Sequence, residues 1–292
     1  MLELHLSNRF DLLAHELAAR TQSEARVAGV LAPIEVIVPS AAVARALTLR
    51  LARAHGVCAN VRFSYLARWL WEQIARLLPG VAAQSPFEPE VLAWRIGKAF
   101  DDAAWCAQWP RLAGWLAQAD PVMRHELATQ VARLFDQYLT FRPDWTEAWA
   151  RGERVPSSPA RAAWRDEERW QAALWQRLSD EILGSQARTR PHPVRQLARV
   201  LEDDALPGAS LPATAHLVAL PSIPPLYLEA LMQLGRRMAL HLYVSDPCRE
   251  YWFDVVDRRR LAWLATRGQV DHHEIGNRLL ASWGRQAQAS LG

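Results

Sequence analysis

Residues 2–17, LELHLSNRFDLLAHEL, set the pattern on which the fold depends. Apolar and polar residues alternate over residues 2–6, which is typical of a β-strand. Ser7 and Asn8 then give a turn and capping signal, and Phe10 begins a series of apolar residues at helical spacing. The sequence therefore predicts that the chain begins with a strand, a turn and a helix.

Two further strand–helix units follow. Residues 34–38, IEVIV, are a short β-branched run that a proline and a serine end before the next helical series. Residues 61–63, VRF, lead through Ser64, an expected N-cap, into a third helix. Strands that alternate with helices of this length indicate a parallel sheet covered on both faces. We therefore expect residues 1–78 to form the first part of an α/β domain.

The pattern changes after this point. Residues 79–210 show helical periodicity and no convincing strand, which predicts an all-helical insert. A proline- and serine-rich stretch at residues 156–159 predicts a loop between helices. Two apolar stripes mark the insert's helices: Met123, Leu127, Val131, Leu134 and Tyr138 form the first, and Trp170, Leu174, Leu178 and Ile182 form the second.

The α/β pattern returns in residues 211–292. Residues 215–220, AHLVAL, predict a strand, a helix follows and ends at Gly235, and residues 238–244 predict the next strand. These elements form a βαβ unit, so we expect this segment to return to the domain that the N-terminal segment begins. No stop signal closes the pattern at the end of the sequence, and we expect the chain to be truncated at its C-terminus.

Composition indicates a soluble globular protein. Half of the 292 residues are hydrophobic and 22% are charged. No apolar run approaches the ~20 residues that a membrane helix needs, and a signal-peptide pattern is missing. The three cysteines are widely spaced and odd in number, which fits a reducing compartment. We expect a cytoplasmic protein without a membrane segment, and a net charge of +3 does not by itself indicate nucleic-acid binding.

A nucleotide-binding P-loop would lie at the first strand–helix junction of such a domain. That loop needs glycines, whose amides approach phosphate, and a lysine that reaches the β and γ phosphates. The junction at residues 7–9, SNR, contains neither. The one lysine of the sequence, Lys98, lies in the helical region, and Leu92 stands where the first glycine of the motif belongs. The sequence therefore lacks a Walker-type ATP site.

Other catalytic arrangements are missing as well. A lysine-dependent metal nuclease would need Lys98 beside paired carboxylates on a strand, whereas Asp101 and Asp102 lie in the helical insert. His272 and His273 have acidic neighbours and can bind a metal, but a solvated loop is the simpler interpretation because no partner cluster lies nearby. We predict a chain without catalytic residues, bound metal or cofactor.

Several motifs, taken together and in order, resemble the RecC family. They are LSNR at residues 6–9, FDQYL at 135–139, RPDW at 142–145, LYLEAL at 226–231, DPCREYW at 246–252 and LLASWG at 279–284. The resemblance covers nearly the whole chain. RecC proteins are several times longer, so we expect this chain to be an N-terminal fragment.

The resemblance implies a fold and a role. RecC subunits are similar in fold to superfamily 1 helicases of the P-loop NTPase type but lack ATP-site motifs, as the junction at residues 7–9 does. In RecBCD, or exodeoxyribonuclease V, the RecB and RecD subunits use ATP and Mg²⁺, and RecB carries the nuclease. RecC splits the duplex and scans the 3′-terminated strand for the Chi sequence during double-strand-break repair by homologous recombination. The implied partners are RecB, RecD and DNA, the last both as a single strand and as a duplex fork.

Candidate DNA-binding residues follow from the resemblance and from helical spacing. They are Ser40 and Ala41 after the second strand, Tyr65, Arg68 and Trp71 in the third unit, and Leu134 and Asp136 in the insert. Trp71 can stack on a base while Arg68, three residues earlier, contacts a phosphate. Asp136 can accept hydrogen bonds from base amino groups.

These candidates have alternatives. Core packing is the alternative for Trp71 and for Leu134, whereas Asp136 lies off the apolar stripe and is expected to be exposed. Ala41 offers no side-chain hydrogen bond, and Arg133 stands where the family has an acidic residue, which leaves the recognised DNA sequence open. An active helicase is disfavoured because nothing would hold the phosphates. A scaffold that binds only proteins is the remaining alternative, and strand binding would distinguish it.

Overall fold

The computed structural model describes residues 1–29, 31–78, 81–155, 165–184, 211–246 and 258–268, together with a few single positions between 194 and 275. The chain divides into two compact units. The sheet unit consists of Met1–Leu70, Pro207–Ile223 and Leu231–Gly292, and the helical unit consists of Trp71–Leu206 and Pro224–Ala230. The expected loop at residues 156–159, the histidine pair at 272–273 apart from His273, and the motif at 279–284 lie outside the described residues.

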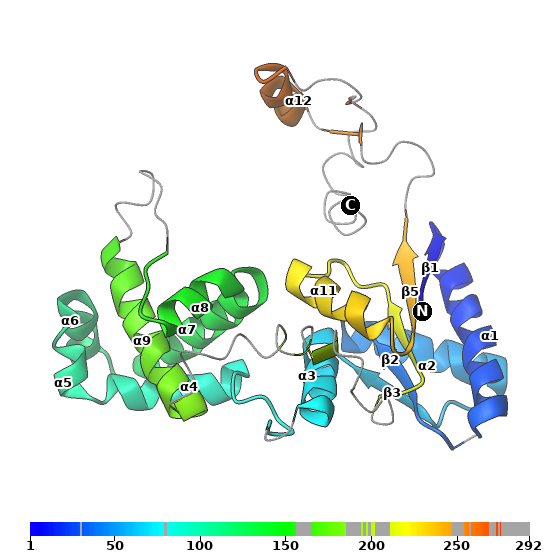
Figure 1. The fold of residues 1–292 in the computed structure, drawn as a ribbon, viewed down its shortest axis with the longest axis horizontal. Helices are drawn as coiled ribbons and strands as arrows, with labels where there is room; N and C mark the ends of the chain where they lie inside the picture. The colour runs from blue at the N-terminus through cyan, green and yellow to red at the C-terminus, as the bar shows by residue number, and fades with distance from the viewer. Residues whose placement is uncertain are drawn as a thin grey trace. The chain divides into compact units, whose positions relative to one another are not determined.

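A parallel sheet of five strands forms the sheet unit (Figure 1). The strands are β1 (Leu2–Ser7), β2 (Ile34–Ile37), β3 (Val61–Ser64), β4 (Thr214–Val218) and β5 (Ala239–Ser245). Their order is β1-β5-β4-β2-β3, and every neighbouring pair is parallel. Strands from both ends of the sequence therefore share one sheet. The predicted α/β class with a parallel sheet is confirmed.

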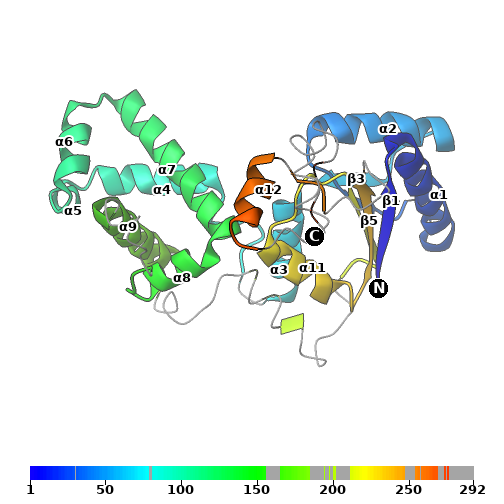
Figure 2. The same ribbon diagram turned by 90° about the horizontal axis from the view of Figure 1, so that it is seen from above.

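Helices cover both faces of this sheet (Figures 1 and 2). The helices of this unit are α1 (Phe10–Ala28), α2 (Ala41–His55) and α12 (Arg258–Ala265). Two other helices belong to it in part: the first residues of α3 (Leu66–Leu77), up to Leu70, and the last residues of α11 (Pro225–Leu234), from Leu231. On the side of α1 and α2, Leu17 and Leu47 are fully buried in one core cluster with Val36 of β2. The first turns of α3 and the last turn of α11 lie on the opposite side. Burial of apolar faces on both sides explains why the strand β2 is buried along its whole length.

In the first strand the polar face is more buried than the apolar face, the reverse of a usual half-buried strand. Leu2, Leu4 and Leu6 are 41%, 51% and 51% exposed, whereas Glu3 and His5 are half-buried. The alternation of apolar and polar residues thus predicted the strand correctly. The more buried face of β1, however, is the polar one, and it is the face that α1 covers.

Polar side chains at the strand–helix junctions act differently from one another. Ser40 caps α2, because its Oγ accepts a hydrogen bond from the Val43 amide at 3.3 Å. Ser7 accepts a hydrogen bond from the Arg9 amide at 3.1 Å, which forms the expected turn before α1. The predicted N-cap at Ser64 is wrong: Ser64 is the last residue of β3, and its buried Oγ has no hydrogen-bond partner within the described part of the chain.

The strand order bears on the helicase-like prediction. In the common doubly wound orders the first strand of the chain is central. Here β1 is at an edge of the described sheet, with β5 as its neighbour. The assignment to a superfamily 1, P-loop NTPase-type fold therefore remains a prediction.

The helical unit is built from helices throughout its described residues. They are α4 (Pro89–Phe100), α5 (Ala103–Cys106), α6 (Pro110–Gln118), α7 (Pro121–Phe141), α8 (Pro143–Ala150) and α9 (Arg165–Leu183). Pro at the first positions of α4, α6, α7 and α8 suits a helix start, where the missing N–H has no intrahelical acceptor in any case. No helix in the described ranges is both long and apolar enough to cross a membrane.

The two predicted stripes of this unit had different outcomes. In α9, Leu174 and Leu178 are buried, and Trp170 and Ile182 pack against the same core, so that stripe is confirmed. In α7 the predicted stripe is rotated by about one residue, because Met123 is 43% exposed and the buried face consists of Ala128, Val131, Ala132, Phe135 and Leu139. A prediction based on large apolar residues overlooks the two alanines on this face, although they lie in the core that α7 shares with α4.

Candidate nucleic-acid interface

The first group of candidate residues lies at the carboxyl edge of the sheet. Strands β2 and β3 are neighbours in register, Ile37 opposite Ser64, and the Val38 amide donates a hydrogen bond to the Ser64 carbonyl at 2.9 Å. Because parallel strands end at the same edge, the segments that follow them, which contain Ser40 and Tyr65, also lie at this edge. Ligands of open α/β sheets bind outside the carboxyl ends of the strands.

The start of α2 offers backbone donors at this edge. Ser40 is half-buried and holds the Val43 amide with its hydroxyl oxygen, which leaves its O–H free to donate. Ala41 and Ala42 are exposed in the first turn of α2, where backbone N–H groups have no intrahelical acceptor. Ala41 has no polar side chain, but its amide and the positive end of the helix suit a phosphate oxygen.

The start of α3 offers an aromatic ring and a cation. Tyr65 is 52% exposed, and its carbonyl accepts the hydrogen bond from the Trp69 amide that opens the helix. Arg68 is exposed and lies three residues further along the chain. Tyr65 directly precedes α3 and Arg68 lies in its first turn, so both residues are at the start of this helix. Tyr65 and Arg68 therefore follow β3 at the edge where Ser40 and Ala41 follow β2.

Trp71 belongs to the helical unit. Its ring is half-buried, packs against the core of that unit and makes an edge contact with Phe87 at 6.4 Å between ring centroids. Its indole N–H donates to the Ala82 carbonyl at 3.0 Å. A packing role, the alternative given for this residue from the sequence, therefore accounts for much of its surface and for its polar atom.

Asp136 is half-buried, which corrects the expectation that it is exposed. The packing of α7 is the reason, because Asp136 lies four residues after Ala132 and three before Leu139, which are both buried. Burial raises the pKa of the Asp136 carboxyl above its usual range, and the Glu90 carboxylate raises it further. Leu134 on the same helix is half-buried as well.

Two residues that the sequence did not single out accompany Asp136. The Tyr227 and Thr140 hydroxyls lie 3.5 Å apart, and both residues belong to the helical unit. Burial raises the pKa of Tyr227, the hydrogen bond with Thr140 lowers it, and the charge of Asp136 raises it. Tyr227 lies within the LYLEAL motif and Asp136 within FDQYL, but only the fold shows that the two motifs meet.

An exposed tryptophan was also missed. Trp94 on α4 is 73% exposed and contacts the His125 ring of α7 at 5.2 Å between centroids. Lys98 is exposed one turn further along α4. The sequence does contain a signal for this surface, because Trp94 lies off the stripe of buried residues to which Leu92 and Ile96 belong. A single exposed aromatic ring is common on protein surfaces, and Trp94 is a candidate contact only together with the neighbouring Lys98.

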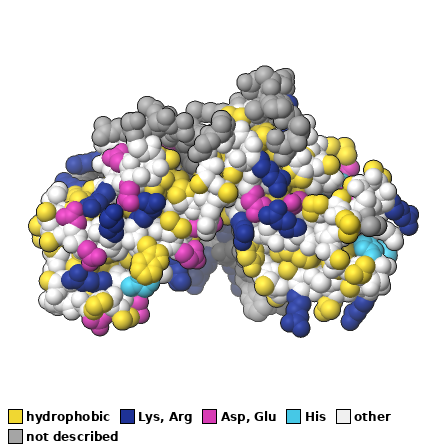
Figure 3. Space-filling model, turned by 90° about the horizontal axis from the view of Figure 1, so that it is seen from below, with side chains coloured by type: hydrophobic (Ala, Val, Ile, Leu, Met, Phe, Trp, Pro, Cys, Tyr) yellow, Lys and Arg dark blue, Asp and Glu magenta, His cyan; other side chains and the backbone are white. Residues whose placement is uncertain are grey.

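Charge does not form a continuous positive field on the face shown in Figure 3. Basic and acidic side chains are interspersed there. This agrees with the small net charge of +3. Contacts with nucleic acid would therefore depend on individual arginines and helix ends beside aromatic rings.

The first strand–helix junction holds no phosphate-binding loop of the Walker type. The Arg9 carbonyl accepts hydrogen bonds from the Leu12 and Leu13 amides, so α1 begins directly after a two-residue turn. The architecture defines the chain as an α/β sheet protein with a helical unit inserted between its strands and without a Walker loop after β1.

Comparison with known proteins makes the assignment specific. The model of the RecC N-terminal domain family matches residues 2–291, and the chain belongs to this family. It is 29% identical to the RecBCD enzyme subunit RecC of Escherichia coli (strain K12), over 98% of this chain and 27% of that protein. It is 26% identical to the Haemophilus influenzae RecC subunit, over 88% and 27%, and 29% identical to that of Mycolicibacterium smegmatis, over 97% and 24%. The chain spans about a quarter of the length of these relatives.

Proposed function

We propose that this chain is the N-terminal, DNA-handling part of a RecC subunit in a RecBCD-type helicase–nuclease. In this role it splits the duplex and guides the 3′-terminated strand, which is scanned for a Chi-like sequence during recombinational repair in the cytoplasm. The chain is noncatalytic, and the RecB and RecD partners supply ATP hydrolysis, Mg²⁺ and nuclease activity. The match of the RecC N-terminal family to residues 2–291 is the observation that carries the proposal.

The sheet unit supports strand binding at the edge formed by the ends of β2 and β3. A strand of DNA needs cations or amides along its backbone and flat rings against its bases, and each stacked base contributes ~1–3 kcal/mol. Tyr65 supplies a ring, Arg68 a cation, and Ser40 with Ala41 the donors of a helix N-terminus. These contacts suit any sequence, because phosphates and π-faces are common to all nucleotides.

The helical unit supports a different kind of contact. Asp136 can accept a hydrogen bond from a base amino group, and Leu134 can contact an apolar base edge. A half-buried carboxylate adds no attraction for phosphates, so it contributes to sequence preference more than to affinity. Trp94, beside Lys98, adds an exposed ring with a cation one helical turn away.

The proposal is tested in the full-length subunit assembled with its partners, by titrating a forked duplex with single-stranded tails at several salt concentrations. We expect Tyr65→Ala to weaken binding by roughly tenfold through lost stacking. Arg68→Ala should lower the slope of log K against log salt by about one phosphate contact. Arg53→Ala, at the exposed C-terminal end of α2, is the matched control and should leave both unchanged.

Two further variants examine the helical unit in the same assay. Trp71→Ala should weaken strand binding, whereas Trp71→Phe keeps a ring for stacking, loses the hydrogen bond to the Ala82 carbonyl and part of the packing surface, and should bind more strongly than Trp71→Ala. Asp136→Ala should change the preferred sequence while total affinity stays within about threefold. If every variant binds DNA like the parent while the complex still assembles, the chain is a protein-interaction scaffold and the proposal is wrong.

A further inference from the structure

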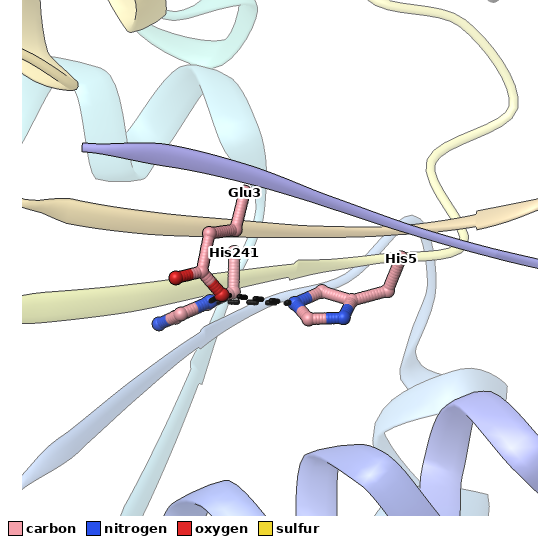
Figure 4. A group of neighbouring side chains, drawn as sticks. All are labelled: Glu3, His5 and His241. Atoms are coloured by element: carbon pink, nitrogen blue, oxygen red, sulfur yellow. Dashed lines mark hydrogen bonds and ion pairs between the residues drawn. The ribbon is translucent and has the colours of Figure 1, made fainter.

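Three metal-ligating side chains meet on one face of the sheet, away from the candidate DNA-binding residues. Glu3 and His5 are two positions apart on β1, so their side chains lie on the same face. His241 on β5 is paired directly with Glu3 in the register of the two strands. Figure 4 shows the three side chains turned toward one another from these neighbouring strands. The cluster belongs entirely to the sheet unit.

The distances between the candidate ligand atoms form a small triangle. Glu3 Oε2 lies 3.2 Å from His241 Nδ1 and 3.8 Å from His5 Nε2, and the two ring nitrogens lie 3.4 Å apart. In a tetrahedral zinc site with bonds of 2.0–2.1 Å, neighbouring ligand atoms are about 3.3–3.4 Å apart. The three atoms therefore have nearly the spacing of one face of such a tetrahedron.

The rings around the cluster hold the two histidines in place. The Tyr243 ring stacks on His5 at 4.7 Å between centroids, and the His216 ring stacks on His241 at 5.2 Å. His216 is itself fixed, because its Nδ1 lies 3.1 Å from the Tyr243 hydroxyl and its Nε2 lies 3.1 Å from the Glu24 carboxylate. The ligand geometry is thus supported by packing and hydrogen bonds, as in preorganised metal sites.

The cluster is partly buried and still open enough for an ion to enter. The side chains of His241, His5 and Glu3 are 7%, 16% and 30% exposed.

One cation competes for this position. The Arg20 guanidinium lies 3.0 Å from Glu3 Oε2 and donates to Glu16 Oε1 at 2.8 Å. Arg20 and the two histidine nitrogens face the same oxygen, Oε2, so a metal bound at Oε2 requires the guanidinium to move to Glu3 Oε1 or to keep only its bond to Glu16. Metal-ligating carboxylates commonly have such a donor behind them.

We propose that Glu3, His5 and His241 form a binding site for a divalent transition metal of the zinc class. Two imidazoles and one carboxylate provide three ligands, and water completes a four-coordinate site. The metal would join the edge strand β1 to β5 through side chains, in addition to their backbone pairing. The proposal is independent of DNA binding, because none of its residues belongs to the candidate interface.

The test uses metal-stripped full-length protein titrated with Zn²⁺ by calorimetry and with Co²⁺ by its visible absorption, which is strong only in tetrahedral coordination. We expect the parent protein to bind one ion. His5→Gln and Glu3→Gln should each lose this ion or bind it at least about tenfold more weakly. His15→Gln is the matched control, since His15 is an exposed histidine of α1. Both test variants change half-buried side chains near the surface, and thermal unfolding without metal checks that they fold.

Two results would overturn the proposal. The first is wild-type protein that takes up neither ion in a tetrahedral site, which would leave the two histidines and Glu3 as a hydrogen-bonded group. The second is uptake that His5→Gln and Glu3→Gln reduce no more than His15→Gln, which would place the ion elsewhere. Bound metal should also raise the unfolding temperature of the parent, and Glu3→Gln should abolish that increase.

Discussion

At the scale of single residues, Asp136 links stability to pH. Its pKa is raised in the folded state by burial and by Glu90, so the folded protein holds this proton more tightly than the unfolded chain does. Stability is therefore lost as the pH rises from the usual range of an aspartate through the folded pKa, and the loss is complete above it. We expect Asp136→Asn to raise the free energy of unfolding at pH 7, because the amide removes a half-buried charge.

The measurement is urea unfolding of the parent and the variant at a series of pH values from neutral downward. The gain should shrink as the pH approaches the range where the parent carboxyl is protonated. Asp180→Asn, on the exposed face of α9, is the control and should change stability by less than about 0.5 kcal/mol. Loss of stability in Asp136→Asn at neutral pH would contradict the assigned burial.

Single residues also show what a sequence can and cannot predict. Glu3 and His5 have the two-residue spacing that places them on one face, and this is visible in the sequence. Their meeting with His241 depends on the pairing of β1 with β5, which no local pattern encodes. The same holds for Asp136 and Tyr227, which come from distant motifs. Local periodicity thus predicts which residues share a face, while the residues opposite them come from the tertiary fold.

At the scale of elements, α7 shows how small residues determine packing. Ala128 and Ala132 are fully buried, and they lie in the core shared with Leu92 and Ile96 of α4. A pattern built on large apolar residues misses such positions, and this explains why the predicted stripe of α7 was rotated. In α9 the large residues themselves form the buried face, so the same reasoning succeeded there.

The packing of α7 leads to a prediction of its own. Ala132→Leu adds three carbons where the core has no room, and overpacking of this kind costs typically 1–3 kcal/mol. We expect thermal or urea unfolding to show that loss. Gln130→Leu, on the exposed face of the same helix, adds an apolar side chain without entering the core and should change stability little. Equal effects of the two substitutions would show that Ala132 does not lie in a close-packed contact.

Across the whole molecule, strand–helix alternation in residues 1–78 and 211–292 was enough to predict one class of fold. The five strands form a single parallel sheet, as that alternation indicated. The order of the strands could not be predicted from local sequence patterns, because it depends on which strands the helical crossovers connect. The edge position of β1 is the most consequential part of that order, since it brings the polar face of β1 beside His241.

The last prediction concerns nucleotide chemistry of the molecule as a whole. A Walker site needs several amides that converge on the phosphates and a lysine for the β and γ oxygens. The turn at residues 7–9 has no glycine, and the only lysine of the sequence, Lys98, belongs to the helical unit rather than to the sheet unit. We expect this chain, purified without partner subunits, to show no saturable ATP binding and no DNA-stimulated ATP hydrolysis. ATP hydrolysis that copurifies with the protein through several columns and disappears in Lys98→Met would contradict this prediction. ATP hydrolysis that Lys98→Met leaves unchanged does not use the one lysine of this chain. Its source is then traced by removing residual partner subunits.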